Sequence, residues 1–310
     1  MPTYLVTGGC GFIGSHLVDA LLAAGHKVRV LDDLSTGKIE NLARAAHLTV
    51  GDVADCELVA RLMDGVDGCY HLAAVASTQR ANEAWLATHR SNLEGTICVL
   101  DAARRERLPV VFASSAAVYG DHSSGPVREN SAVRPIGAYG ADKLGSELHA
   151  RVASLVHGVP TVGFRFFNVY GPRQHPGSPY SGVVSIFVDR LLQGAPIDIH
   201  GDGRQVRDFI YVRDVVRFLI EGMARASLEP RVFNACTGTG TSILTLARTI
   251  GRLCGAEVKM RFLPARVGDI RRSLGSPELA ARHLSVRAQV GLAEGLRETI
   301  EFLAPRRDAA

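Results

Sequence analysis

The sequence predicts an α/β fold: a doubly wound parallel sheet followed by a smaller C-terminal α/β domain. Short runs rich in β-branched and aromatic residues alternate with longer amphipathic runs, and the short runs are apolar throughout. Strands of that kind are buried on both faces, which is typical of a parallel sheet covered by helices. The chain has 310 residues, and 46% hydrophobic content is enough to bury the core of such a fold.

The alternation runs through the first half of the chain. The expected strands are Tyr4–Val6, Lys27–Leu31, Gly68–Leu72, Val110–Ser114 and Thr161–Phe166. The expected helices are Gly14–Ala24, Glu57–Met63, Asn92–Arg105 and Tyr139–Val156. After a Gly/Pro-rich break over Gly171–Gly182, we expect a helix, a strand and finally a frayed tail at Val183–Gln193, Ile197–His200 and Pro305–Ala310. We therefore place a first domain at residues 1–168, with a returning segment near 205–236, and a second at 169–310.

Charge and cysteine content exclude several classes of protein. The net charge is +4 and the basic residues are scattered, so no run is typical of binding to nucleic acid or a membrane surface. No stretch reaches the roughly 18 consecutive apolar residues of a membrane span, and the N-terminus carries no charged leader, so we expect a cytoplasmic protein. The six cysteines lie far apart without a CxxC pair, which predicts buried free thiols and no metal site.

A glycine-rich turn follows the first strand and opens the first helix. Gly8, Gly11 and Gly14 have the GxxGxxG spacing. Glycines there let the chain turn tightly and let a pyrophosphate approach the backbone, while the N–H groups of the helix start hold the anion. Asp32 ends the next strand about 20 residues further on, where a carboxylate accepts hydrogen bonds from an adenine ribose and repels a 2′-phosphate. The pattern predicts NAD rather than NADP as the cofactor.

Other residues fall at strand ends, on the sheet edge where a doubly wound fold binds its ligand. Asp52 and Val53 follow an extended run, and the small residues of Leu72–Ala74 end the next strand, where a flat ring can lie against the backbone. Asn92 opens the predicted helix, so we expect it to act as an N-cap, to support the active site, or to do both.

The catalytic signal is a tyrosine and a lysine one helical turn apart. Tyr139 and Lys143 share a helix face, and an ammonium near the phenol favours the phenolate, lowering a pKa that is otherwise about 10. Ser115 supplies a hydroxyl from the end of a strand. Beside a nicotinamide, the tyrosine would remove an alcohol proton, the serine would orient the substrate oxygen, and the lysine would hold the ribose and tune the tyrosine.

Together these motifs resemble the extended short-chain dehydrogenase/reductase family over essentially the whole chain. The likeness is carried by the runs TGGCGFIGSHL, DDLSTG, HLAAVAS, SSAAVYGD, YxxxK, RFFNVYGPRQ and GDGRQVRDFIYV. It implies a Rossmann domain that binds NAD and a second domain that binds a nucleotide sugar. It also implies cofactor contacts from Phe12, Ile13, Asp33, Ser35, Thr36 and Gly37, in addition to the residues above.

Within that family, two positions after Ser115 separate different reactions. The resemblance implies an acidic pair there in nucleotide-sugar dehydratases and a glutamate at the later position in UDP-glucuronate decarboxylases, whereas this chain has Ala116 and Ala117. Elimination of water needs an acid to protonate the leaving hydroxyl, and alanine cannot supply one. The sequence is therefore similar to the UDP-hexose 4-epimerases, in which C4 is oxidised to a transient 4-keto sugar and reduced from its opposite face.

The same resemblance assigns substrate contacts to the second half of the chain. Asn168 and Arg207 match contacts to the UDP phosphates, and Arg266 with Asp269 matches residues that grip phosphate and uridine ribose. Ser273 falls where glucose-specific epimerases resemble one another in a bulky tyrosine. A serine leaves room for a 2-acetamido group, which implies turnover of UDP-GlcNAc and UDP-GalNAc, alone or beside UDP-Glc and UDP-Gal.

Other functions stay open from the sequence. A UDP-glucuronate 4-epimerase is the nearest alternative, although related uronate enzymes resemble one another in a threonine instead of Asn168 and an arginine instead of His175. A nucleotide-sugar reductase or dehydratase and a non-catalytic nucleotide-sugar-binding protein are further alternatives, and the intact serine, tyrosine and lysine argue against the last. Relatives pair two helices across a dimer axis, so the resemblance also implies a homodimer through Asn92–Arg105 and Tyr139–Val156.

Overall fold

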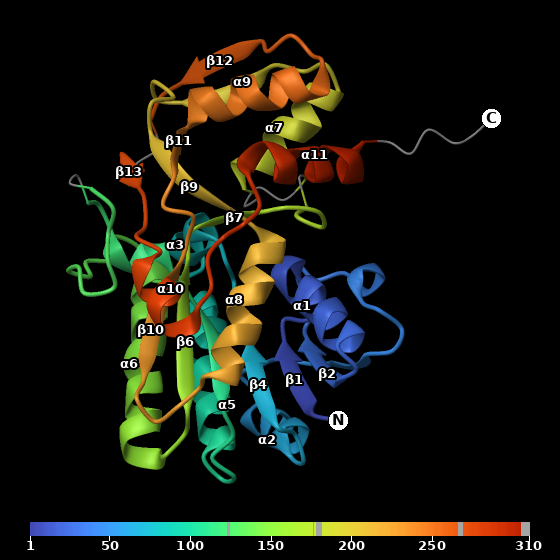
Figure 1. Ribbon diagram of the computed structural model, residues 1–310, viewed down its shortest axis with the longest axis vertical. Coiled ribbons are helices and arrows are strands. Elements are labelled where there is room, and N and C mark those ends of the chain that lie inside the picture. The colour runs from blue at the N-terminus through green and yellow to red at the C-terminus, as the bar shows by residue number, and fades with distance from the viewer. Residues whose placement is uncertain (123–124, 176, 178–181, 266–268, 305–310) are drawn as a thin grey trace.

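Seven parallel strands form the central sheet of the computed structural model, which describes residues 1–122, 125–175, 177, 182–265 and 269–304 (Figure 1). The strand order is β10-β6-β5-β4-β1-β2-β3. The strands are β1 Thr3–Thr7, β2 Lys27–Asp32, β3 His47–Val50, β4 Gly68–His71, β5 Val110–Ser115, β6 Thr161–Phe166 and β10 Arg231–Ala235. The chain winds outward from β1 to β3 and then crosses back to β4, so the order reverses between β1 and β4. A doubly wound sheet binds its ligand at that reversal.

Helices cover both faces of this sheet. One hydrophobic core joins the sheet to α1 Phe12–Ala23, α8 Val212–Ala224 and α10 Glu278–Leu284. A second core, on the other face, joins it to α2 Cys56–Met63, α5 Gly95–Ala103 and α6 Ala138–His157. Shorter helical pieces are η1 Ile39–Asn41, α3 Thr78–Glu83, α4 Trp85–His89, η2 Arg90–Glu94 and η3 Ala116–Tyr119. The fold class predicted from the sequence is confirmed.

The remaining elements gather beyond the carboxyl ends of the central strands, in the upper part of Figure 1. Their strands are β7 Asn168–Tyr170, β8 Ile197–His200, β9 Val206–Tyr211, β11 Gly240–Ser242, β12 Met260–Leu263 and β13 Arg272–Ser273. Their helices are α7 Val183–Leu192, α9 Ile243–Cys254 and α11 Leu292–Leu303. In this group β9 pairs with β7, β11 and β13, and a third hydrophobic core joins the sheet to the three helices.

Local sequence explains where several helices begin and end. Asp55 caps α2, since its side chain accepts a hydrogen bond from the Leu58 N–H at 3.0 Å. Gly158 ends α6 in the left-handed conformation, with φ of 69°. The predicted strands occur within one residue of their expected bounds, and most predicted helices within two.

The helix predicted over Asn92–Arg105 begins earlier than expected. Helical structure starts at Trp85 in α4 and passes through the π-helical turn η2 before α5, so Asn92 lies inside a helical stretch. The prediction that Asn92 is an N-cap is therefore wrong. The tail expected at Pro305–Ala310 falls outside the described residues.

The prediction that all six cysteines are free thiols is wrong for one pair. Cys56 of α2 and Cys98 of α5 form a disulfide, with their Cα atoms 4.8 Å apart, while the other four cysteines are free. The two residues are 42 positions apart in the chain, and only the packing of α2 against α5 brings them together. Within the described ranges, no helix is long and apolar enough to cross a membrane.

Candidate functional site

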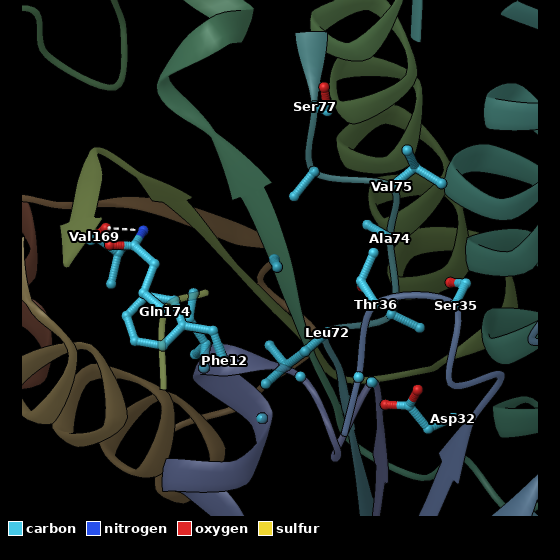
Figure 2. Close-up of a pocket in the computed structure, with 18 of the residues that line it drawn as sticks. Phe12, Asp32, Ser35, Thr36, Leu72, Ala74, Val75, Ser77, Val169 and Gln174 are labelled. Carbon is cyan, nitrogen blue, oxygen red and sulfur yellow. Dashed lines mark hydrogen bonds between the residues drawn. The ribbon is translucent and has the colours of Figure 1, made fainter. Parts of the chain in front are cut away.

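A cavity of about 700 Å³ lies at the reversal point of the central sheet. Its wall contains every cofactor residue expected from the sequence except Asn92. These are Gly8, Gly11, Phe12, Ile13, Gly14, Asp32, Asp33, Ser35, Thr36, Gly37, Asp52, Val53, Leu72, Ala73, Ala74, Tyr139 and Lys143. Figure 2 shows Asp32, Ser35 and Thr36 at one end, and Phe12, Val169 and Gln174 at the other.

The glycine turn leaves backbone exposed to this cavity because larger side chains do not fit. A Cβ atom at Gly8, whose φ is +72°, would lie 2.8 Å from the Ala73 nitrogen, and one at Gly14 would overlap the Gly8 carbonyl oxygen. Helix α1 starts after Gly11 without a side-chain cap, so its first N–H groups point toward the turn without a side-chain partner. Such N–H groups at a helix start bind anions.

Asp32 lies at the end of β2 and is only 6% exposed. Its carboxylate accepts hydrogen bonds from the Cys10 and Leu34 N–H groups, each at 2.9 Å. Burial raises the pKa of this carboxyl, and these two hydrogen bonds oppose the increase. Asp32 therefore ties the glycine turn to the loop after β2, a structural role that the sequence did not reveal, while it still lines the cavity.

Ser115, Tyr139 and Lys143 meet at the cavity wall. Ser115 and Tyr139 both line the cavity, and the Ser115 hydroxyl oxygen accepts from the Ala117 N–H at 3.1 Å. Lys143 is buried and donates from Nζ to the Ala113 carbonyl oxygen at 2.9 Å. Its Nζ lies 5.9 Å from the centre of the Tyr139 ring. The structure thus brings the three predicted catalytic side chains together.

The expected lowering of the Tyr139 pKa by Lys143 is not found. Burial raises the pKa of Tyr139, and the Ser115 side chain lowers it in part. Burial also lowers the pKa of Lys143 to about 8, against the opposing charge of Asp142. The prediction failed because desolvation acts on both groups and because the ammonium is directed to a backbone carbonyl.

Asn92 supports the cavity wall from behind. It is fully buried, and its Oδ1 accepts from the Val75 N–H at 2.7 Å while its Nδ2 donates to the Val75 carbonyl oxygen at 3.4 Å. Val75 itself lines the cavity. Asn92 therefore fixes the segment after β4 and does not line the cavity.

Ser115 lines the large cavity, whereas the described substrate residues predicted in the second half of the chain lie around β9 and do not line it. Arg207 of β9 forms an ion pair with Asp269 and is the register partner of Ser273 in β13. Asn168 of β7 donates to the Asp208 carbonyl oxygen at 3.2 Å. Ser273 lines a second, much smaller cavity of about 10 Å³ together with Ala116. Arg266 lies outside the described residues.

Comparison with known proteins identifies the family. A family model described as the NAD dependent epimerase/dehydratase family matches residues 4–236. The UDP-glucose 4-epimerase of Mycolicibacterium smegmatis is 38% identical over 306 residues, covering 96% of this chain and 97% of that protein. This chain belongs to the NAD-dependent epimerase/dehydratase family. The resemblance to the extended short-chain dehydrogenases/reductases is thereby confirmed.

Members of this family with solved structures share the whole fold. The UDP-glucose 4-epimerase of Thermotoga maritima, solved with UDP-glucose, has a TM-score of 0.93 at 35% identity and covers 97% of this chain and 98% of that chain. The UDP-N-acetylglucosamine 4-epimerase of Methanobrevibacter ruminantium, solved with UDP-N-acetylmuramic acid, has a TM-score of 0.92 at 32% identity, with 97% of each chain covered. In sequence, a dTDP-glucose 4,6-dehydratase of Actinoplanes is also similar: it is 33% identical over 98% of this chain and 98% of that protein.

The cavity fits the NAD of this epimerase/dehydratase family. The glycine turn presents backbone where a Cβ would collide, which matches the close approach of a pyrophosphate. The carboxylate of Asp32 lies beside this turn and lines the same cavity, as expected for a contact to the ribose hydroxyls. Within the described residues, no group of three or more His, Cys, Asp and Glu side chains is arranged to hold a metal ion.

Several cavity residues of this NAD-dependent epimerase/dehydratase were missed from the sequence. Arg80, Arg173 and Gln174 line the cavity. Arg173 pairs with Asp19 of α1 at 2.7 Å and Gln174 donates to the Val169 carbonyl oxygen at 3.2 Å (Figure 2), yet Arg173 Nη1 and Gln174 Oε1 are buried without a partner. The run RFFNVYGPRQ contained two of these residues, but nothing in it showed that the loop folds back over α1.

Proposed function

We propose that the chain catalyses NAD-dependent 4-epimerisation of a UDP-hexose through a transient 4-keto sugar. The substrates are UDP-GlcNAc and UDP-GalNAc, UDP-Glc and UDP-Gal, or both pairs. One observation carries the proposal: Ser115, Tyr139 and Lys143 line the same cavity as the glycine turn and Asp32. The proposed proton acceptor, Tyr139, and the cofactor site therefore lie in the same cavity.

Each of the three proposed catalytic residues has a defined role in this reaction. Tyr139 takes the proton of the sugar 4-hydroxyl, and Ser115 orients that oxygen. Lys143 holds the nicotinamide ribose. When bound, NAD supplies a hydride acceptor for sugar C4 and returns the hydride to the opposite face. The 4-keto sugar must turn between the two transfers, so the sugar is held less firmly than the nucleotide.

The residues after Ser115 favour epimerisation over dehydration. Ala116 and Ala117 stand where an acid would protonate a leaving hydroxyl, and neither methyl group can do so. Ser273 and Ala116 are both short side chains that line one small cavity. The absence of a bulky side chain at Ser273 supports acceptance of a 2-acetamido group. The likeness to an N-acetylglucosamine 4-epimerase supports the same substrate class.

A UDP-glucuronate 4-epimerase is the second candidate. Arg80, Arg173 and His175 line the large cavity. A guanidinium group there could form a paired hydrogen bond with a sugar carboxylate. This cationic lining is the observation that keeps the uronate reaction in consideration.

We also propose a homodimer formed through α5 and α6. Helix α6 exposes four large apolar side chains on one face, and α5 adds another. They are Leu148, Val152, Leu155, Val156 and Ile97, with between 39% and 70% of each side chain exposed. A contiguous apolar face of this kind is typical of a protein interface. A cytoplasmic location stays a prediction from the sequence.

The decisive experiment incubates the purified protein with UDP-Glc, UDP-GlcNAc or UDP-GlcA and separates the products. Conversion to the 4-epimer without net consumption of NAD supports the proposal, and Tyr139→Phe should lower the rate by about 100- to 10,000-fold. Stoichiometric consumption of NAD would indicate a dehydrogenase or reductase. Loss of water from the sugar would indicate a dehydratase, and absence of any conversion would indicate a binding protein.

A further inference from the structure

Three side chains on one face of α6 lie next to the last three residues of β5, Ala113, Ser114 and Ser115. Tyr139, Lys143 and Glu147 follow one another at intervals of four residues, so they line a single helix face. Tyr139 lines the cavity together with Ser115, and Lys143 Nζ donates to the Ala113 carbonyl oxygen at 2.9 Å. The third contact belongs to a residue without a role in the reaction described above.

Glu147 makes that third contact. The Ser114 hydroxyl donates to Glu147 Oε1 at 2.5 Å, and Ser114 is only 1% exposed. Ser114 lies on the same face of β5 as Val110 and Phe112, because alternate residues of a strand share a face. Val110 and Phe112 pack in the core shared with α6. Ser114 is therefore the last side chain of β5 that faces α6, and the next residue, Ser115, lines the cavity.

Arg165 of β6 fixes the Glu147 carboxylate in place. Its Nε donates to Oε1 at 2.8 Å and its Nη2 to Oε2 at 2.7 Å, and both side chains are 7% exposed. Arg165 is also the register partner of Ser114 on the neighbouring strand. A buried, two-point ion pair has a narrow geometric tolerance, so the carboxylate cannot follow a sliding helix without losing partners.

The same guanidinium group also contacts the segment between β5 and α6. Arg165 lies over the Tyr119 ring at 4.7 Å and donates from Nη1 to the Glu129 carbonyl oxygen at 3.1 Å. Tyr119 donates to Asn234 Oδ1 at 2.6 Å, and Asn234 Nδ2 donates to the Val127 carbonyl oxygen at 3.0 Å. This network joins Glu147 of α6, through Arg165, to the segment that connects β5 with α6.

We propose that Glu147 is a positioning residue for the reaction: by clamping Ser114 and Arg165, it sets the register of α6 on β5 and so the distance between the Ser115 hydroxyl and the Tyr139 phenol. This inference rests on the proposed function and adds a specific positioning residue to it. Lys143 alone does not set the register, because its long flexible side chain reaches a backbone oxygen over a range of helix positions.

The test compares Glu147→Gln with a matched change on the same helix. Glu147→Gln keeps an acceptor for Ser114 but loses the charge that holds Arg165. We expect kcat to fall by about ten- to 100-fold, because a small misplacement of reacting groups has that effect, with KM for the UDP-sugar nearly unchanged. Because the Ser115 side chain lowers the pKa of Tyr139, a larger distance between the two should also shift the pH dependence of kcat to higher pH.

Ser154→Ala is the control for a purely structural effect. Ser154 of α6 is 3% exposed, donates to the Val159 carbonyl oxygen at 2.8 Å, and lies 2.7 Å from the Thr161 hydroxyl of β6. The substitution Ser154→Ala removes a buried polar contact between α6 and the same sheet, away from the reacting groups. We expect a lower melting temperature with unchanged kcat and pH profile. An equal change of kcat and pH profile in Glu147→Gln and Ser154→Ala would overturn the proposal, and so would no change in Glu147→Gln.

Ser114→Ala keeps the proposal testable if Glu147→Gln does not fold, because it cuts the link to β5 and leaves the ion pair intact. Its kcat should fall in the same direction with the same shift in pH dependence, and an unaltered profile would contradict the clamp. The ultraviolet titration of Tyr139, read as the difference from matched Tyr139→Phe proteins, needs no substrate. If the wild-type chain converts no UDP-sugar, the proposed function fails, while a shifted Tyr139 titration in Glu147→Gln still supports the clamp.

Discussion

The imidazole of His71 and the hydroxyl of Thr7 join β4 to β1, with His71 Nδ1 2.8 Å from Thr7 Oγ1. The Thr7 oxygen already accepts from the Leu72 and Ala73 N–H groups, each at 3.2 Å, so its own proton is donated to Nδ1. The ring proton of His71 is therefore on Nε2, which donates to the Thr96 hydroxyl oxygen at 3.0 Å. This neutral imidazole holds the backbone that lines the cofactor cavity.

Acid should destabilise the protein through His71. Burial lowers the pKa of His71 to about 3, from 6.5, so the unfolded chain binds a proton that the folded chain excludes between these values. The stability due to the neutral ring is complete above pH 6.5 and is lost as the pH falls toward 3. The free energy of unfolding should drop by about 1.4 kcal/mol per pH unit from this group, and His71→Gln should show a correspondingly shallower slope in denaturant titrations between pH 6 and 4. Equal slopes in the two proteins would contradict this assignment.

Asp32 should determine the preference for NAD over NADP. Replacing Asp32 by Asn removes the charge that repels a 2′-phosphate while keeping one acceptor for the backbone N–H groups of the turn. We expect the ratio of NADP to NAD affinity, measured by binding titration, to rise about tenfold or more, since each tenfold step is about 1.4 kcal/mol. Asp55→Asn removes the same charge from the cap of α2, outside the cavity, and should leave the ratio unchanged.

Ser273 should control acceptance of N-acetylated sugars. Ser273→Tyr would place a bulky ring near Ala116, where the serine side chain is short. We expect kcat/KM for UDP-GlcNAc to fall by about ten- to 200-fold relative to UDP-Glc, the range that size discrimination in a pocket provides. Ser273→Ala keeps the space and should preserve the ratio. Undiminished turnover of UDP-GlcNAc by the tyrosine variant would remove Ser273 from the specificity site.

The exposed face of α6 should mediate dimer formation. Leu155 is 59% exposed, and Leu155→Glu would place a charge in the proposed apolar interface. The variant should sediment as a monomer at concentrations where the wild-type chain is a dimer. Leu228→Glu alters a similarly exposed leucine, 53% exposed, outside α5 and α6, and should remain dimeric. A monomeric wild-type chain would show that this face has another use.

The sequence predicted the local features of the site well because they depend on short spacings. The glycine turn, Asp32 after the second strand, and the four-residue interval from Tyr139 to Lys143 can be recognised within one strand–helix unit. The electrostatics of the site could not be recognised in this way. The sequence predicted that Lys143 lowers the Tyr139 pKa, but desolvation depends on atoms contributed by many separate segments, and it reverses the direction of the shift.

By itself, the sequence determined the α/β class and the glycine turn, and it pointed to the three side chains proposed to react, since periodicity and motif spacing are properties of contiguous residues. Tertiary structure alone decided which distant residues meet. The contact of Ser114 with Glu147 spans 33 positions, that of Asn92 with Val75 spans 17, and the disulfide of Cys56 with Cys98 spans 42. No local pattern encodes these pairs, because each depends on how helical segments pack against the sheet and against their neighbours.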